Sequence, residues 1–243
     1  MILEVTFKEN AQSFKTDLGE IYRVSDGGYE RGLAAGKQAE WDAFWDAFQK
    51  NGSAKSYQGA FRDCWKDEIF KPKYDLRPTD GGVAQMFQTS KIVDLKGCLK
   101  KQGVVLDTSK CTIFLQMFQS SSVKYIPIID ASNCISNNNY TFSSDSIISI
   151  EKLIVSEKTI YGTSTFDSKN LETVTFEGVI GQNGLNLSRC VKLSYESLMS
   201  VINCLKDYSG TGTTYTVTLG AANLAKLTDA EKAIATQKGW SLA

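Results

Sequence analysis

The residue types that most often carry catalysis and metal binding are absent or scattered in this chain. Its 243 residues include no histidine, which removes histidine general bases, histidine-containing triads and the commonest metal ligand. The six cysteines are far apart and form no C-x-x-C pair, so a zinc site is not indicated; they are Cys64, Cys98, Cys111, Cys134, Cys190 and Cys204. We expect free thiols, mostly buried, and no bound metal or cofactor.

Acidic pairs give no distinct catalytic signature either. Asp67-Glu68, and Asp42 with Asp46, are surrounded by lysines or lie on an expected helix face, where a solvated surface is the ordinary role. Two glycine-rich segments lack the strand-to-helix context or the lysine that phosphate binding requires. We therefore expect no enzymatic activity. A glycan-degrading enzyme remains a lesser alternative, which two carboxylates converging in a cleft would favour.

The charge balance and the hydropathy pattern exclude two classes of partner. Lysine and arginine together number 27, as do aspartate and glutamate, so no net field attracts nucleic acid. No apolar run approaches the roughly 20 residues that a membrane helix needs, and no membrane insertion is expected. The opening residues MILEVTFKEN lack the basic and apolar regions of a secretory leader, so we expect no export by that route.

A repeat dominates the middle of the chain. Phe87, Phe118, Phe142 and Phe166 each precede serine closely, and the steps between them are 31, 24 and 24 residues. Aliphatic residues recur five and eight positions after each phenylalanine: Ile92, Val123, Ile147 and Leu171, then Leu95, Ile126, Ile150 and Val174. A fixed period of this length is typical of a solenoid whose units bury their apolar sides against their neighbours. Residues 81–193 are therefore predicted to form a short leucine-rich-repeat-like β-solenoid with these twelve side chains in its core.

Polar residues fill the rest of each unit, most densely in 132–146 (SNCISNNNYTFSSDS). Serine, threonine and asparagine side chains satisfy backbone groups at corners, and we favour that role. Hydrogen bonding to a sugar is the alternative for the same run.

The N-terminal part is predicted to form two units. Residues 1–24 form a β arm, with strands at 2–8 and 19–24 and a connecting turn between them. Residues 25–80 form a helical anchoring region and linker, whose first helix carries an aromatic stripe that includes Trp41, Phe44, Trp45 and Phe48. This stripe indicates either an oligomerising helix or a helix packed on its own domain.

Residues 194–243 are predicted to form an α/β cap over the open end of the solenoid. Residues 195–205 have helical spacing with Ser194 as the cap, and 214–219 is strand-like. Residues 221–237 return to helix, as one helix or as two short ones, with a Thr228–Glu231 capping-box pattern. Trp240–Leu242 completes the chain as a last strand. The predicted fold class is thus α+β.

The units FQSSSVKYIPIIDASNC and FDSKNLETVTFEGVI resemble the BspA-like class of leucine-rich repeats over about 105 residues, 86 to 190. The flanks resemble phage- or prophage-encoded tail and fibre proteins of gut Firmicutes. The resembling pieces are KENAQSFKTDLGEIY, GYERGLAAGKQAEWDAFWDAFQKNG and LTDAEKAIATQKGWSLA.

The resemblance implies a non-enzymatic virion protein, assembled in the bacterial cytoplasm and presenting a repeat surface to a partner. Its expected partners are further copies of itself in a trimer or hexamer, other virion proteins, and a host-surface glycan or protein. A bacterial cell-surface leucine-rich-repeat adhesin is the alternative, which a leader or wall anchor in the full gene would favour.

Overall fold

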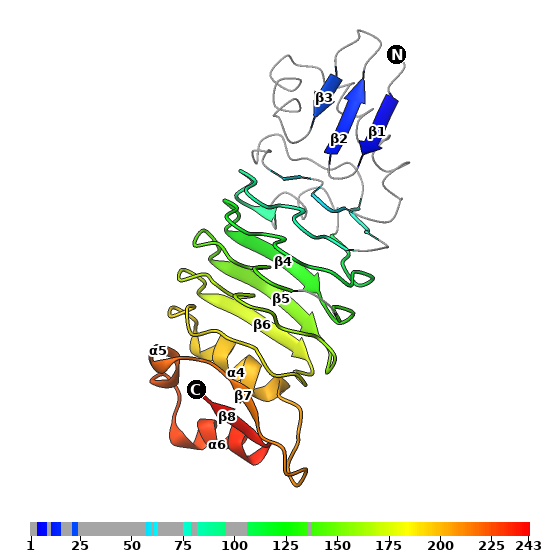
Figure 1. Cartoon of the computed structure of the whole chain (residues 1–243). Coiled ribbons are helices and arrows are strands. Elements are labelled where there is room, and N and C mark those ends of the chain that lie inside the picture. The colour runs from blue at the N-terminus through cyan, green and yellow to red at the C-terminus, as the bar shows by residue number, and fades with distance from the viewer. Residues whose placement is uncertain are drawn as a thin grey trace.

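The structure is a computed structural model that describes residues 4–8, 11–15, 21–23, 57–59, 61–62, 75–78, 82–95, 106–135 and 138–243. In chain order its elements are β1 (Glu4–Lys8), β2 (Ala11–Lys15), β3 (Ile21–Arg23), β4 (Tyr125–Asp130), β5 (Ser149–Val155), β6 (Thr173–Gly178), α4 (Tyr195–Cys204), β7 (Tyr215–Val217), α5 (Ala221–Leu224), α6 (Asp229–Gln237) and β8 (Trp240–Leu242). Figure 1 shows β4, β5 and β6 side by side, followed by the C-terminal elements.

The N-terminal strands β1, β2 and β3 form an antiparallel sheet in that order. Val5 pairs with Phe14, and Phe14 pairs with Tyr22 on its other side. The segment predicted to be a connecting turn therefore contains β2. Its sequence AQSFK is short and mostly polar, so the sequence alone gives little indication of a strand. Pairing with both β1 and β3 places this segment in the sheet.

The central sheet is parallel, in the order β4-β5-β6. Tyr125 pairs with Ser149 and Ser149 with Thr173, so each strand begins 24 residues after the one before it and seven residues after a phenylalanine of the repeat. The strands are rich in isoleucine, valine and threonine, which favour extended backbone. β6 ends at Gly178 with φ at 98°; a Cβ there would lie 2.0 Å from the carbonyl oxygen of Val155, so only glycine fits this position.

The prediction of a leucine-rich-repeat-like solenoid is wrong. The described residues form short sheets of three, three and two strands with few helices, not one strand per unit along a continuous solenoid. The unit that begins at Phe87 contributes isolated bridges such as Asp94 with Tyr125, because its segment KIVDL places charged residues that disfavour strands among the apolar ones. At the other end, helix α4 occupies the place beside β6.

The apolar residues of the repeat nevertheless pack together. All twelve side chains named from the repeat are at most 2% exposed. The four phenylalanines stack in a line that also includes Phe61, with ring centroids 5.5, 5.5, 5.8 and 5.1 Å apart from Phe61 to Phe166. We call these five residues the phenylalanine row. Ile128, ten residues after Phe118, is 43% exposed, whereas Ile129 is buried.

Turns that contain these phenylalanines are joined by a row of backbone hydrogen bonds. In each bond an N–H of the earlier segment donates to a carbonyl of the next one, as in Phe87 to Met117, Phe118 to Thr141 and Phe142 to Thr165. The turns need left-handed backbone, and non-glycine residues supply it two positions before a phenylalanine: Gln85, Gln116, Tyr140 and Ser164, with φ of 53–57°. Such residues adopt this conformation infrequently, so the surrounding hydrogen bonds and packing hold it in place.

The C-terminal elements match their predicted ranges closely. Ser194 caps α4, and Thr228 and Glu231 form the predicted capping box at the start of α6. β7 and β8 pair in parallel. One hydrophobic cluster contains described residues from Tyr57 to Trp240, so it includes residues on both sides of the predicted domain boundaries at 80/81 and 193/194.

Helix α4 covers the outer edge of the central sheet. An uncovered edge strand presents unpaired N–H and C=O groups to other chains. Here the hydroxyl oxygen of Ser197 accepts a hydrogen bond from the N–H of Val174 at 3.0 Å, and that of Ser200 accepts one from Phe176 at 3.1 Å. Two serine hydroxyls thus take the place of a fourth strand.

We expect Ser197→Ala to destabilise the protein by about 1–3 kcal/mol, because it leaves the N–H of the buried Val174 without an acceptor. Hydrogen exchange of the Val174 amide should accelerate at the same time. Asn203→Ala, at an exposed position of the same helix, is the control and should change stability by less than about 0.5 kcal/mol. Unchanged exchange at Val174 would contradict the role of Ser197.

Candidate interaction surface

The polar run at 132–146 satisfies the backbone of neighbouring segments. The Thr141 hydroxyl donates to the carbonyl of Phe114 at 2.9 Å, and the Ser144 hydroxyl donates to that of Ser121 at 2.6 Å. The Asn138 amide donates to the carbonyl of Ile160 at 3.0 Å. This confirms the corner role that the residue types predicted. These side chains are engaged within the protein, which leaves them poorly suited to bind a sugar.

Two described carboxylates on the surface are held ionised by lysine side chains. Asp145 lies 2.7 Å from Lys169, and Glu157 lies 2.7 Å from Lys206. Hydrogen bonds from these lysines lower the pKa of both carboxyl groups. A general acid needs a raised pKa so that it holds its proton at neutral pH, so these two carboxylates are unsuited to that role. The pairs Asp67-Glu68 and Asp42 with Asp46 lie outside the described residues.

The described cysteines are free, and three of them are buried: Cys111, Cys134 and Cys190. Cys190 stands 24 residues after Phe166, and its sulfur contacts the carbonyl oxygen of that residue at 3.9 Å. Burial raises the pKa of Cys111 and of Cys190 to about 12. No group of three or more aspartate, glutamate and cysteine side chains is placed to hold a metal ion within the described segments.

We expect iodoacetamide at pH 8 to leave Cys111 and Cys190 unmodified in the folded protein. Their thiols are buried and their pKa values lie far above the pH, so almost no reactive thiolate forms. Peptide mapping by mass spectrometry measures this, and the same protein in guanidinium chloride is the control in which both residues react. Equal labelling in the folded and unfolded states would contradict the burial.

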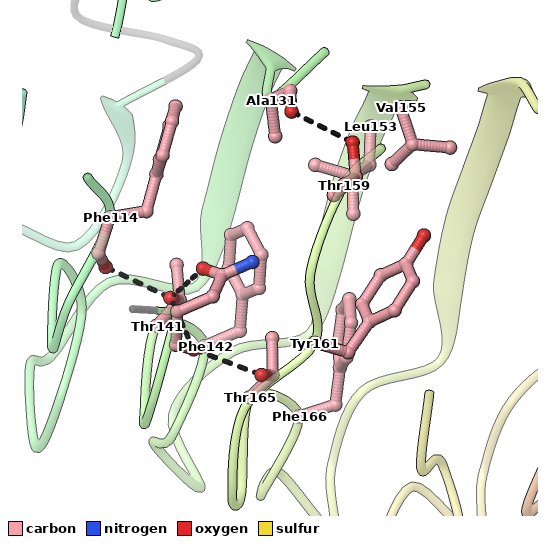
Figure 2. Close-up of a pocket in the computed structure, with 11 residues that line it drawn as sticks. Phe114, Ala131, Thr141, Phe142, Leu153, Val155, Thr159, Tyr161, Thr165 and Phe166 are labelled. Atoms are coloured by element: carbon pink, nitrogen blue, oxygen red, sulfur yellow. Dashed lines mark hydrogen bonds between the residues drawn. The ribbon is translucent and has the colours of Figure 1, made fainter. Parts of the chain in front are cut away.

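A small cavity lies inside the core between the phenylalanine row and the central sheet (Figure 2). It is lined by Phe114, Ala131, Asn138, Thr141, Phe142, Leu153, Val155, Thr159, Tyr161, Thr165 and Phe166. Its volume is about 10 Å³, which is close to the space that one water molecule needs. The cavity is therefore too small for an organic substrate.

The exposed side chains of the central sheet form the strongest candidate for an interaction surface. We call them the outer sheet face, which consists of the exposed residues Tyr125, Ile128, Thr173, Thr175 and Glu177 together with the half-buried Lys152. Tyr125 is 38% and Ile128 is 43% exposed. Lys152 and Glu177 form a cross-strand ion pair at 2.6 Å. An aromatic and an aliphatic side chain beside paired charges is a composition suited to contact with another molecule, since aromatic residues are enriched in interfaces.

The sequence did not identify the outer sheet face. Among the three strands only β6 alternates between exposed and buried residues over its first five positions, so the available signal was the period-two pattern of Thr173, Val174, Thr175 and Phe176. The residues predicted to mediate oligomerisation, Trp41, Phe44, Trp45 and Phe48, lie outside the described residues.

No protein-family model, curated protein or solved structure matches this chain. Among the helices that the structure describes, none has both the length and the apolar character needed to span a membrane.

Proposed function

We propose that this protein is a non-enzymatic structural component of a phage or prophage virion, in a tail or a fibre, and that the outer sheet face contacts a host-surface molecule or another virion protein. The exposure of Tyr125 and Ile128 on an ordered parallel sheet is the observation that carries the proposal. The resemblance of both flanks to tail and fibre proteins supplies the virion context.

The packing of the core supports the proposed binding role, because it restricts movement of the strands that form the outer sheet face. The phenylalanine row and the backbone hydrogen bonds between turns join each segment to the next. A binding residue on a rigid element loses less conformational entropy when its partner binds. Strand β4, which carries both Tyr125 and Ile128, is thus well placed to present them to a partner.

Mass spectrometry of particles purified from the bacterium that carries the gene tests the virion assignment. We expect the chain in particles at a constant ratio to other tail proteins. Recovery from the cell envelope and not from particles would contradict the assignment and favour the alternative, a bacterial cell-surface adhesin.

A double substitution, Tyr125→Ser with Ile128→Ser, tests the surface itself. We expect it to reduce binding of the purified protein to host cells, or to the other virion proteins, without a large loss of stability. Val191→Ser is the matched control, because Val191 is 45% exposed and lies outside the central sheet. Unchanged binding by the double variant would reject this surface.

We also propose that the protein forms a trimer or hexamer through Trp41, Phe44, Trp45 and Phe48, since association buries aromatic surface and closed symmetry satisfies each copy equally. Light scattering should give a defined oligomer for the full chain and a smaller species when all four are replaced by serine. Because Tyr57, Phe61 and Leu76 belong to the main cluster, point substitutions are preferable to removal of residues 1–80.

A further inference from the structure

The dipeptide Asn183-Gly184 lies in an exposed turn between β6 and α4. An asparagine followed by glycine can react with its own main chain, because glycine has no side chain to obstruct its backbone nitrogen. That nitrogen attacks the side-chain amide carbon Cγ and closes a cyclic imide. Within the described part of the chain, neither the N–H of Gly184 nor the amide nitrogen Nδ2 of Asn183 donates a hydrogen bond. The attacking nitrogen and the leaving group are therefore unrestrained.

The third atom of this reaction, the side-chain oxygen Oδ1 of Asn183, is held by a donor. It accepts a hydrogen bond from the backbone N–H of Thr216 at 2.8 Å. Thr216 lies in β7, whose pairing with β8 fixes its backbone. Negative charge develops on Oδ1 when the backbone nitrogen attacks Cγ, and a fixed N–H at hydrogen-bond distance from such an oxygen lowers the barrier.

The turn itself requires the glycine. Gly184 has a φ of 100°, a backbone conformation that residues with a side chain rarely adopt. A Cβ at this position would lie 3.0 Å from the carbonyl oxygen of Tyr161. The fold therefore retains the residue that makes Asn183 reactive.

Asn186, in the same exposed segment, has the opposite arrangement. Its side-chain oxygen accepts hydrogen bonds from the N–H and the hydroxyl of Ser188 at 3.0 and 2.7 Å. The next residue is Leu187, whose N–H donates to the carbonyl of Thr218 at 2.7 Å. The backbone nitrogen that would attack is thus engaged, and a branched side chain stands beside it. Asn186 therefore serves as an internal control for Asn183.

We propose that Asn183 is a site of spontaneous deamidation in the folded protein. Hydroxide removes the proton of the Gly184 N–H, and the nitrogen forms a bond to Cγ of Asn183. The bond between Cγ and Nδ2 breaks, and Nδ2 takes a proton from water and leaves as ammonia. Water then opens the imide. Opening at Cγ gives aspartate, and opening at the main-chain carbonyl gives isoaspartate, in which the chain continues through the former side chain. Water is the only co-reactant, and nothing is oxidised or reduced.

Isoaspartate at this position alters the connection between the turn and the strand β7. The carbonyl of Leu185 accepts a hydrogen bond from the N–H of Thr218 at 3.0 Å, and the N–H of Leu187 donates to the Thr218 carbonyl. One extra main-chain carbon shifts Leu185 and Leu187 relative to Thr218. Aspartate keeps the normal chain length and an oxygen that accepts from Thr216. We therefore expect hydrogen exchange at the Thr218 and Leu187 amides to be faster in the isoaspartate product than in the aspartate product.

Peptide mapping of the full chain by mass spectrometry tests the proposal. The folded protein is incubated at pH 8, and trypsin cleavage after Lys169 and Arg189 places both asparagines in one peptide, where fragment ions assign the change. We expect loss of the Asn183 amide to be on the order of tenfold faster than loss of the Asn186 amide, a difference of about 1.4 kcal/mol in activation free energy. The rate at Asn183 should fall at pH 6, because less of the backbone nitrogen is deprotonated.

A sample unfolded in guanidinium chloride shows whether the fold permits the reaction. Equal rates at Asn183 and Asn186, or an Asn183 that reacts in the unfolded chain and stays intact in the folded protein, would overturn the proposal. Asn183→Gln is the control variant, because its longer side chain closes a larger ring less readily, and its peptide should stay unmodified over the same period. The same mass gain in that variant would place the reaction at another residue and would also overturn the proposal.

Discussion

Phe118→Ala should lower the free energy of unfolding by about 3–5 kcal/mol, a large part of the 5–15 kcal/mol that domains typically possess. Phe118 is fully buried and lies at the centre of the phenylalanine row, 5.5 Å from the ring of Phe87 and 5.8 Å from that of Phe142. The backbone on both sides is fixed by hydrogen bonds to the neighbouring turns. The core therefore cannot collapse to fill the space, and a cavity remains.

Chemical denaturation of the full chain measures this effect. Phe118→Leu keeps much of the apolar volume and should cost about 1.5 kcal/mol or less. Tyr125→Ala removes a ring of comparable size from the exposed side of the sheet and should cost about 1 kcal/mol or less. Similar losses for Phe118→Ala and Tyr125→Ala would mean that the phenylalanine row is not the centre of the core.

Ile126→Asp and Val174→Asp should each destabilise the protein by several kcal/mol, because each places a carboxyl group with no partner in an apolar core. Ile126 is 0% and Val174 is 1% exposed. Lys124→Ser and Glu172→Ser are the controls at exposed neighbouring positions, and each should cost less than about 0.5 kcal/mol. Thermal melts compare the four variants, and equal tolerance at both kinds of position would contradict the assigned register.

The loss caused by Ile126→Asp should depend on pH. Burial raises the folded-state pKa of the introduced carboxyl above its unfolded value of about 3.9. Between these two values the folded state holds a proton that the unfolded state has released, so the variant loses stability as pH rises. The difference from the parent protein should narrow as pH falls from 7 toward 4. A difference that stays constant over this range would indicate that the carboxyl reaches solvent.

The buried positions could be predicted from the sequence because the core repeats. Phe118, Phe142 and Phe166 occupy equivalent places 24 residues apart, and each is followed at fixed distances by aliphatic residues that are also buried. A side chain enclosed by similar neighbours in each unit must be apolar and of similar size. Phe61 was missed because its segment FRDC lacks the serine that marked the other units.

The fold class could not be predicted from the same pattern. Periodicity identifies which side chains are buried, but it does not determine how far strand pairing extends. The central sheet stops at β6 because Tyr195–Cys204 has helical spacing and docks against that strand. Among the described residues between β3 and β4, strand pairing consists of isolated bridges. Both limits depend on competition between local propensity and packing, which a period alone does not reveal.

The outer sheet face could not be predicted from the sequence either. Tyr125 and Ile128 look like core residues by type, and only the register of the strands shows that they face outward. The left-handed backbone at Gln85 and Gln116 could not be predicted from the sequence, because most positions with this conformation are occupied by glycine or asparagine.

The backbone hydrogen bonds between the turns of the phenylalanine row have an electrostatic consequence. At Phe87, Phe118 and Phe142 the N–H donates to a later segment in the chain, so the peptide dipoles at these turns point the same way. Aligned peptide dipoles add, as they do in a helix. This edge of the protein therefore carries partial positive charge at its end near Phe166 and partial negative charge at its end near Phe61. The polarity belongs to the backbone, so it persists at every pH at which the chain stays folded.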